Sequence, residues 1–312
     1  MLESHLYLGF DTSAYTTSLA AMVDDRVWQF KKVLDVRLGE CGLRQSEALF
    51  QHIKNFPLLF EELCKQVPVH DFKNVTVSVS NAPRNIEKSY MPVFLAGQNF
   101  GKTIAAALDA EYKEFSHQEG HIMAGIYSSK ADILNEPFFA FHLSGGTTEL
   151  LLVDKSDVSG RLNTKIIGKT LDISAGQFID RIGIKMGFGF PAGKFLDDIA
   201  MENFKNESVK VSAKDFLINF SGAETKYERE LEKNMSSGDV SNSVMQCICK
   251  TILSVIKQAK NKYNIANVLM VGGVCSSRYL HKLMENEEGI YFASPSLSTD
   301  NAVGICILGK GI

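Results

Sequence analysis

The chain has no long apolar run. None of its uncharged apolar stretches reaches the roughly 18 residues that a membrane-spanning helix needs. The first residues, MLESHLYLGFDTS, also lack the basic segment and apolar segment that mark a secretory signal peptide. The sequence therefore predicts a cytoplasmic protein that does not associate with a membrane.

The chain also lacks a strong charge of either sign. It carries 33 Lys and Arg against 36 Asp and Glu, which gives a formal net charge of −3 at pH 7. Proteins that bind nucleic acid through their overall charge are usually strongly basic, so that class is disfavoured. An RNA substrate would need a local basic patch or help from a companion protein.

Cysteine is scarce and shows no zinc-ribbon spacing. The close pair Cys247 and Cys249 lies in an apparent helix, where neighbours two apart point to different faces. We expect reduced, buried thiols in a cytoplasmic protein. That expectation covers all six cysteines: Cys41, Cys64, Cys247, Cys249, Cys275 and Cys306.

No low-complexity segment and no obvious linker interrupts the chain, but one plan occurs twice. HLYLGFDTSAYTTSLAAM predicts a strand, a tight polar turn and a strand, and VWQFKKVLDV follows as a third strand. About 130 residues later, PFFAFHLSGGTTELLLVDKS repeats strand, turn and strand. The repeat indicates two related lobes facing each other across a cleft. The alternative is coincidence, because strand-turn-strand units are common.

Helical periodicity dominates the rest of the chain. It predicts a helix from Gln45 or Ser46 that is bent at Pro57, and another from about Val93. VTVSVS and VLMVGG predict strands. Further helices are expected over residues 175–188, 194–203, 240–262 and 278–286, with a last helix that begins at Thr299 or Asp300.

The segment HQEGHIMAGIY predicts a helix with two histidines one turn apart. His117 and His121 then share one face, where two imidazoles can hold one metal ion, as in H-E-x-x-H zinc enzymes. The base position of those enzymes is Gln118 here, and Glu119 lies about 100° further round the helix. This indicates a metal that positions a substrate rather than one that cleaves peptides. The alternative is a solvated helix face without a ligand role.

Two glycine-containing turns suit a nucleotide. Ser144-Gly145-Gly146-Thr147-Thr148 offers backbone N–H groups and hydroxyls with no side chain in the way of a phosphate or carbamoyl group. Gly272-Gly273 ends a strand at the start of a helix, where a phosphate or an adenosine could rest. Hairpin turns use such glycines routinely, so an ordinary turn is the alternative.

Six short motifs follow one another between Gly9 and Gly309. In order they are G-x-D-T-S, H-x-x-x-H, S-G-G-T-T, F-x-x-G, G-G-V-x-S-S-R and S-T-D-N-A. This series resembles the TsaD family of tRNA N6-adenosine threonylcarbamoyltransferases, formerly described as O-sialoglycoprotein endopeptidases. The resemblance implies an α/β fold of the actin-like ATPase type (sugar kinase, Hsp70 and actin), with two ribonuclease-H-like lobes around a central cleft. We expect lobe I over residues 1–131 plus 298–312, and lobe II over residues 132–297.

The resemblance also implies a metal centre. His117 and His121 match the family's metal histidines, and Asp300 matches its carboxylate ligand. Such ligands suit one Fe²⁺ or Zn²⁺ per subunit, with open positions for substrate oxygens. His142 stands where some relatives place a tyrosine that approaches the metal, so we predict it as a third imidazole ligand. The alternatives are a half-buried strand histidine for His142 and a helix N-cap for Asp300.

A nucleotide site is implied as well, for ATP, ADP, AMP or an adenylate intermediate. Asp180 would hold the ribose hydroxyls, and Gly193 would let the sugar or base lie against the backbone. Asp11 and Ser144 are the expected catalytic residues. The expected cofactor-binding residues are Ser144, Gly145, Gly146, Thr147, Thr148, Asp180, Gly193, Gly273 and Ser277.

The chain departs from the family pattern at the substrate end. The family's E-T-S-C-D-E-T is D-T-S-A-Y-T-T here, so Tyr15 and Thr16 replace two acidic residues implicated in transfer. Thr147 and Glu149 replace the histidine and glutamine of S-G-G-H-T-Q, and Glu224 reverses the charge of the lysine in F-S-G-L-K-T. The predicted metal ligands are kept.

Three functions fit these observations. The first is transfer of a threonylcarbamoyl group from its adenylate to N6 of adenosine 37 of tRNA, without a covalent protein nucleophile. By resemblance, tRNA would be served through companion proteins, a TsaB-like dimerisation partner and a TsaE-like ATPase. The second is a non-catalytic or differently specific nucleotide-binding paralogue, which the lost acids favour and the complete metal set disfavours. The third, a metallo-endopeptidase, is disfavoured by Gln118 at the base position.

Overall fold

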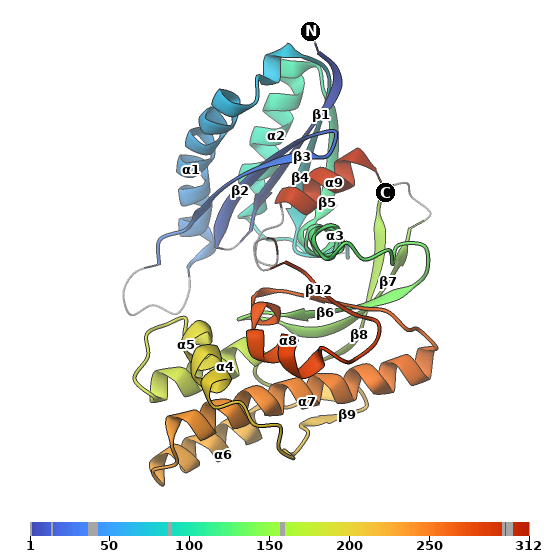
Figure 1. Ribbon diagram of the computed structural model, residues 1–312. Coiled ribbons are helices and arrows are strands. Elements are labelled where there is room, and N and C mark those ends of the chain that lie inside the picture. Colours follow the sequence, from blue (N-terminus) through green and yellow to red (C-terminus); the bar gives the residue numbers. More distant parts are fainter. Residues whose placement is uncertain are drawn as a thin grey trace. The chain divides into compact units, whose positions relative to one another are not determined.

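The structure is a computed structural model that describes residues 2–13, 15–36, 43–86, 89–156, 160–294, 297 and 302–311 (Figure 1). It divides into two compact units. Unit 1 comprises Met1–Ser128, Ser156–Leu162 and Thr299–Ile312, and unit 2 comprises Ser129–Lys155 and Asn163–Ser298. Within the described ranges, no helix combines the length and the apolar character that crossing a bilayer requires.

Unit 1 is built on a five-stranded sheet in the order β3-β2-β1-β4-β5. Strand β1 (Leu2–Thr12) pairs antiparallel with β2 (Thr16–Val23), which pairs antiparallel with β3 (Arg26–Val33). On its other side β1 pairs in parallel with β4 (Phe72–Ala82), and β4 pairs in parallel with β5 (Glu111–Ser116). The central strands β1 and β4 are buried over most of their length, because helices cover both faces of the sheet.

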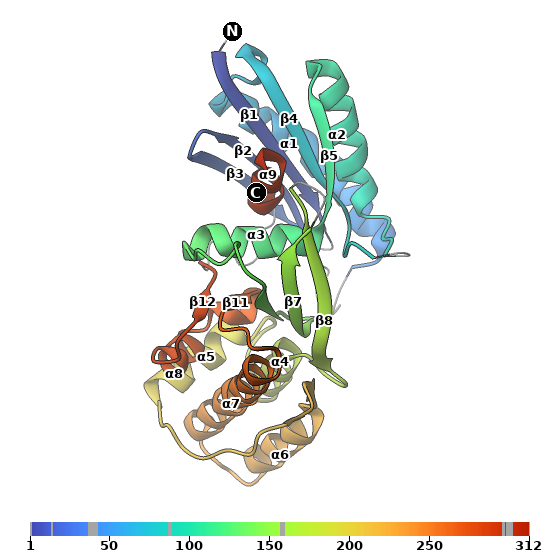
Figure 2. The ribbon, with the colours of Figure 1, turned by 90° about the vertical axis from the view of Figure 1, so that its right-hand side faces the viewer.

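Helices cover the two faces of the unit 1 sheet unequally. The core on one face joins the apolar residues of β1 and β4 to Phe56 and Leu63 of α1 and Ala105 of α2. The other face carries α9, whose backbone lies so close to β1 that a side chain at Gly9 would collide with it (Figure 2). The helical segments of this unit are α1 (Gln45–Gln66), η1 (Val69–Asp71), α2 (Phe94–Leu108), α3 (His117–Ser129) and α9 (Ala302–Lys310).

Unit 2 contains a seven-stranded sheet in the order β12-β11-β6-β7-β8-β10-β9. Strand β6 (Phe138–Leu143) pairs antiparallel with β7 (Thr148–Lys155), and β8 (Leu162–Thr170) lies next to β7. On its other side β6 pairs in parallel with β11 (Val268–Val271), which pairs in parallel with β12 (Ile290–Phe292). The short strands β9 (Ala213–Lys214) and β10 (Leu217–Ile218) extend the β8 edge.

The helices of unit 2 pack around one large core. That core joins the apolar residues of β6 and β11 to Phe178 of α4, Leu196 of α5 and the buried side of α7. The helical segments are α4 (Ala175–Lys185), α5 (Gly193–Glu202), α6 (Ser221–Glu232), α7 (Ser237–Tyr263), η2 (Gly273–Ser276) and α8 (Arg278–Met284).

The two sheets repeat one plan. Each has a central strand, β1 or β6, with an antiparallel partner and a third strand on one side and two parallel strands on the other. The two strand-turn-strand segments found in the sequence are the β1-β2 and β6-β7 pairs of these sheets. The predicted internal repeat is therefore confirmed.

Sequence analysis missed several elements, and the three longest of them are largely polar. Strand β5, EYKEFS, lies at a sheet edge and is buried only at its end, so no alternating pattern marks it. Strand β8 lies between β7 and β10, and its buried and exposed residues do not alternate regularly. Helix α6 buries little besides Tyr227. Helix α4 also ends at Lys185 rather than at residue 188, and the expected helix starts at Thr299 and Asp300 lie outside the described residues.

Four of the cysteines are buried free thiols, as predicted. Cys64 is partly exposed, and Cys41 lies outside the described residues. Burial raises the pKa of the Cys249 thiol to about 12, so this group stays protonated at neutral pH. Buried protonated thiols are poor nucleophiles.

Candidate functional site

Helix α3 begins at His117 because Ser116 and Glu119 cap it. The Glu119 carboxylate accepts hydrogen bonds from the Ser116 backbone N–H at 2.8 Å and from the Ser116 hydroxyl at 2.6 Å. The Ser116 hydroxyl in turn accepts the Glu119 N–H at 3.3 Å. This is a capping box, in which two helix-end donors are satisfied reciprocally. The S-x-x-E spacing was present in the sequence and would have predicted it.

The buried Glu119 carboxylate has further partners in unit 1. The Leu162 backbone N–H donates to its second oxygen at 3.4 Å, and a guanidinium nitrogen of Arg161 lies 3.9 Å from the first. Arg161 also donates to the Glu114 carbonyl at 2.5 Å. A buried carboxylate is stable only when it is hydrogen-bonded and close to a cation, and Glu119 has both. Its role is therefore to hold the start of α3.

The two histidines of α3 lie together on one face, as their spacing predicted. Their ring centroids are 4.7 Å apart and the ring planes meet at 70°. Both residues are half-buried. Helix α9 crosses α3 so closely that a side chain at Gly304 would collide with the Gly120 carbonyl. This close packing against α9 holds α3 in place. Donor atoms held in this way can bind one metal ion between them.

Asp11, a buried acidic residue near the end of β1, lies beside His117. Both of its carboxylate oxygens are 3.1 Å from His117 Nδ1, and the Ser80 hydroxyl donates to one of them. Burial alone would raise the pKa of Asp11, but the adjacent His117 and the hydrogen bonds from His117, Ser80 and Ser13 lower it below its usual value. The carboxylate is therefore ionised at neutral pH.

The turn that follows Asp11 is held by His52 of α1. One ring nitrogen of His52 is 2.7 Å from the Ser13 carbonyl, and the other is 2.9 Å from the Thr17 hydroxyl. Burial lowers the pKa of His52. The two positions where family acids are replaced lie on the same turn. Tyr15 is 52% exposed and Thr16 is half-buried.

The structure describes one of the two remaining predicted metal ligands. His142 is a half-buried residue of β6, in register with Glu149 of β7, and belongs to unit 2. Asp300 lies outside the described residues. In the part of the chain that the structure describes, no three His, Cys, Asp or Glu side chains form a group suited to a metal ion. The two imidazoles of α3 are thus the ligand pair that the structure places together.

In unit 2 the predicted phosphate loop connects β6 and β7. The Ser144 hydroxyl accepts the backbone N–H groups of Thr147 at 3.0 Å and Gly146 at 3.4 Å, so this side chain shapes the loop. The buried Thr148 hydroxyl accepts the N–H of Ala175 at 2.8 Å. The loop is therefore tied to the start of α4.

The glycines of this loop border open space. A side chain added at Gly145 or Gly146 would meet no atom within 4 Å, and neither residue has a left-handed backbone. Gly176 of α4, in contrast, packs against the loop, since its Cβ would lie 2.6 Å from the Gly145 Cα. The Ser174 hydroxyl donates to the Gly145 carbonyl at 2.8 Å. The loop thus exposes bare backbone on one side and is fixed by α4 on the other, which fits the approach of a phosphate.

Asp180 and Gly193, the predicted ribose and sugar contacts, lie together at the junction of α4 and α5. One Asp180 oxygen accepts the Ala192 N–H at 2.8 Å, and Gly193 is the first residue of α5. Burial raises the pKa of Asp180. The second carboxylate oxygen of Asp180 is also a hydrogen-bond acceptor and could accept a hydrogen bond from a hydroxyl group.

Gly273 is the first residue of the short helix η2, and Ser277 directly follows that helix. Gly272, just before it, has a left-handed φ of 98°, and a side chain there would collide with the Leu143 carbonyl. Gly273 is exposed. The Ser277 hydroxyl accepts the Leu280 N–H at 3.1 Å and donates to Asp197, so it caps α8. Its capping role was not foreseen.

An open hollow of about 690 Å³ lies along α5 and the start of α8. Its walls are charged, and Arg278 pairs with Asp198 across it at 2.5 Å. Sequence analysis did not single out these residues, because isolated charges on helices carry no motif. The lining residues are Lys194, Asp197, Asp198, Met201, Glu202 and Arg278.

The sequence profile of TsaD, tRNA N6-adenosine threonylcarbamoyltransferase, matches residues 46–306. The chain belongs to the TsaD family. Two relatives bearing the name tRNA N6-adenosine threonylcarbamoyltransferase show the extent of the similarity. The protein of Thermosipho africanus is 24% identical, over 97% of this chain and 93% of its own length. That of Dictyoglomus turgidum is 30% identical, over 97% of this chain and 92% of its own length.

Solved structures confirm the fold. Full-length HypF in its phosphate- and nucleotide-bound form matches 99% of this chain and 54% of its own, with a TM-score of 0.59 and 16% identity. Component A of the (R)-2-hydroxyglutaryl-CoA dehydratase of Acidaminococcus fermentans matches 98% of this chain and 97% of its own, with a TM-score of 0.54 and 14% identity. The predicted actin-like ATPase fold is thus confirmed for this TsaD family member.

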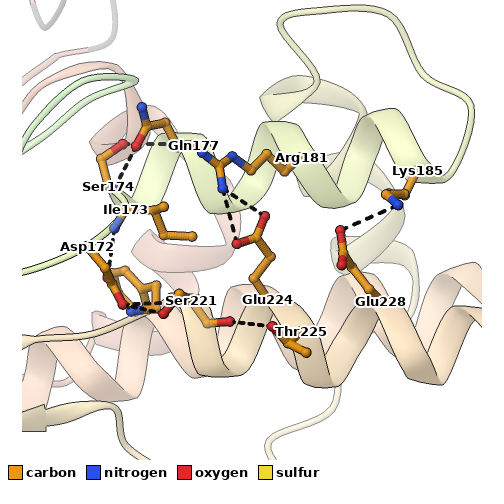
Figure 3. Close-up of polar contacts among 11 residues, drawn as sticks. Asp172, Ile173, Ser174, Gln177, Arg181, Lys185, Ser221, Glu224, Thr225 and Glu228 are labelled. Atoms are coloured by element: carbon orange, nitrogen blue, oxygen red, sulfur yellow. Dashed lines mark hydrogen bonds and ion pairs between the residues drawn. The ribbon is translucent and has the colours of Figure 1, made fainter.

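One departure from the family pattern is explained by the structure. Glu224, which replaces the lysine of F-S-G-L-K-T, pairs with Arg181 of α4 at 3.2 and 3.3 Å (Figure 3). Lys185 and Glu228 form a second pair between α4 and α6 at 3.8 Å. The charge reversal at Glu224 therefore supplies an ion pair between these two helices.

Proposed function

We propose that this chain is a threonylcarbamoyladenosine synthase-type acyltransferase. It would move a threonylcarbamoyl group from its adenylate to N6 of adenosine 37 of tRNA. The N6 amine would form a bond to the carbonyl carbon, the bond from that carbon to the phosphate oxygen would break, and AMP would leave while N6 loses a proton. The observation that carries the proposal is the His117 and His121 pair on a capped helix, in a chain that matches the TsaD family over most of its length.

The residues of α3 fit the metal that the family implies. Two imidazoles on one helix face, with a carboxylate behind His117, are a donor set suited to Fe²⁺ or Zn²⁺. Asp300 and His142 remain predicted ligands. When bound, the metal would supply Lewis-acid polarisation of the donor's carbonyl group.

Unit 2 would hold the adenylate. The exposed backbone at Gly145 and Gly146 would border its phosphate, and their amides would stabilise the charge on the leaving group. Asp180 would accept a ribose hydroxyl through the oxygen not used by Ala192, and Gly193 would lie against the sugar or base. Ser144 and Thr148 would act by holding the loop in shape.

Partners are proposed on the same basis. Helix α1 exposes the apolar side chains of Phe50, Ile53 and Leu58 on unit 1, and a TsaB-like dimerisation partner would cover them. tRNA would be bound with companion proteins, since the chain carries a net charge of −3. A TsaE-like ATPase completes the set that the family resemblance implies.

A non-catalytic or differently specific paralogue is the second candidate. It is favoured by the first turn, where Tyr15 and Thr16 stand in place of two acids and Tyr15 is 52% exposed. Such a protein would keep nucleotide binding and lose transfer.

A reconstituted reaction separates the two candidates. Purified protein is incubated with tRNA, threonine, bicarbonate, ATP and the companion proteins, and the nucleosides are analysed by mass spectrometry. The transferase proposal expects threonylcarbamoyladenosine with the wild type and none with His117→Ala. If a relative such as the Dictyoglomus turgidum protein forms product under the same conditions and this chain does not, the paralogue is supported. Calorimetry with AMP then tests nucleotide binding on its own.

A further inference from the structure

Asp11 is placed to act on His117 and not on a substrate. It is 2% exposed and lies near the end of β1, in register with Ser18 of β2. Its two oxygens are both 3.1 Å from His117 Nδ1, and the Ser80 hydroxyl of β4 donates to it from the other side. A carboxylate enclosed in this way has no surface on which a substrate could dock.

The contact with Asp11 bears on which ring nitrogen of His117 carries hydrogen. An ionised carboxylate accepts hydrogen bonds and cannot donate them, so the bond to Asp11 requires Nδ1–H. In a neutral imidazole the other nitrogen, Nε2, then holds a lone pair. Metal ions bind that lone pair, and histidine ligands commonly give their other N–H to a carboxylate that fixes the ring.

We propose that Asp11 is a positioning residue that holds His117 in the Nδ1–H tautomer, with Nε2 as the metal-binding nitrogen. The inference rests on the metal-binding part of the proposed function. Asp11 and Glu119 then have different roles at the start of α3. Glu119 sets where the helix starts, and Asp11 sets the orientation and tautomer of its first imidazole.

The first test needs no metal. In the metal-free wild type at alkaline pH, ¹⁵N NMR of the histidine rings should show His117 with hydrogen on Nδ1, with the signal assigned through His117→Ala. In Asp11→Leu the tautomer should shift towards Nε2–H, the form that free histidine prefers. A wild-type ring with hydrogen on Nε2 would overturn the proposal, whether or not the protein transfers anything.

The second test measures Zn²⁺ affinity by competition with a chelator. Asp11→Asn should weaken binding roughly 10- to 100-fold, and Asp11→Glu, which keeps the carboxylate, should recover most of that loss. Asp172→Asn is the matched control, because Asp172 is a hydrogen-bonded carboxylate of unit 2 that accepts the N–H of Phe220 at 2.9 Å. Its Zn²⁺ affinity should equal that of the wild type.

The outcomes separate this inference from the function. A folded Asp11→Asn protein that binds Zn²⁺ as tightly as the wild type would overturn the positioning role. A wild type that binds no Zn²⁺ and no Fe²⁺ would overturn both the role and the metal centre. Absence of transfer activity together with the expected tautomer and affinity changes would reject only the transferase.

Discussion

Ser116 and Glu119 satisfy each other's backbone N–H groups at the start of α3. The helix that carries both histidines therefore begins at a fixed residue, His117. His121 then lies one helical turn further along on the same face. If the helix began one residue earlier or later, the His117 imidazole would be rotated by about 100° around the helix axis and would lose its contact with Asp11.

Replacing Glu119 by alanine should destabilise unit 1 and weaken metal binding together. The substitution leaves the buried Ser116 and Leu162 N–H groups without their acceptor, which costs about 1–3 kcal/mol for a buried donor. Urea denaturation and Zn²⁺ titration measure the two effects. Lys65→Ala, which removes an exposed pair with Glu61, is the control and should leave both quantities within error. An unchanged denaturation midpoint in Glu119→Ala would show that the capping box is dispensable.

Gly145→Ala should fold normally and lose nucleotide affinity. The added methyl group meets no protein atom within 4 Å and the backbone is not left-handed, so stability should be unchanged or rise by less than about 1 kcal/mol. The methyl group would occupy the space next to the bare loop backbone. Calorimetry with AMP and thermal melting are the measurements. Gly176→Ala is the contrasting variant, since its Cβ would lie 2.6 Å from the Gly145 Cα and should lower the melting temperature. Equal AMP affinity in Gly145→Ala and wild type would place the phosphate elsewhere.

The contribution of His52 to stability should fall as the pH is lowered. Burial lowers its pKa in the folded protein below the unfolded value of about 6.5, so the unfolded chain binds the extra proton first. The contribution is therefore complete above the unfolded pKa and is lost as the pH falls through the folded pKa. Urea denaturation of wild type and His52→Gln across that window checks this. Their difference in unfolding free energy should shrink on acidification, and a difference that grows would contradict the sign.

Glu224→Lys, which restores the family residue, should cost little stability. The Arg181 side chain is 50% exposed and the Glu224 side chain is 12% exposed. Ion pairs with one partner in solvent contribute up to about 1 kcal/mol, with like-charge repulsion of similar size. Thermal melting at low and high salt measures the effect, which should diminish with salt. Glu228→Lys at the neighbouring pair is the matched variant. A loss that salt does not reduce would mean that Glu224 acts through packing rather than through charge.

Local patterns predicted much of the fold, and contacts distant in sequence decided the site. The β6-β7 turn and the helix of His117 and His121 were predicted because their periodicity lies within a few residues. The contact between Asp11 and His117 joins residues 106 positions apart, so no spacing rule could supply it. Ser144 was predicted as catalytic from its motif, and this stays a prediction; the contacts of its hydroxyl with the N–H groups of Gly146 and Thr147 were not predicted. The polar strand β5 was missed because a sheet edge needs no apolar alternation.

Helix α9 has a consequence for how this protein is made. It lies directly on the glycines of β1 and α3, although it is encoded about 180 residues after α3 and nearly 300 after the first strand. While the ribosome is still translating unit 2, one face of the unit 1 sheet has no cover. Helix α3 therefore lacks its contact with Gly304 until α9 has been synthesised, and during that time its start is held by the partners of Glu119.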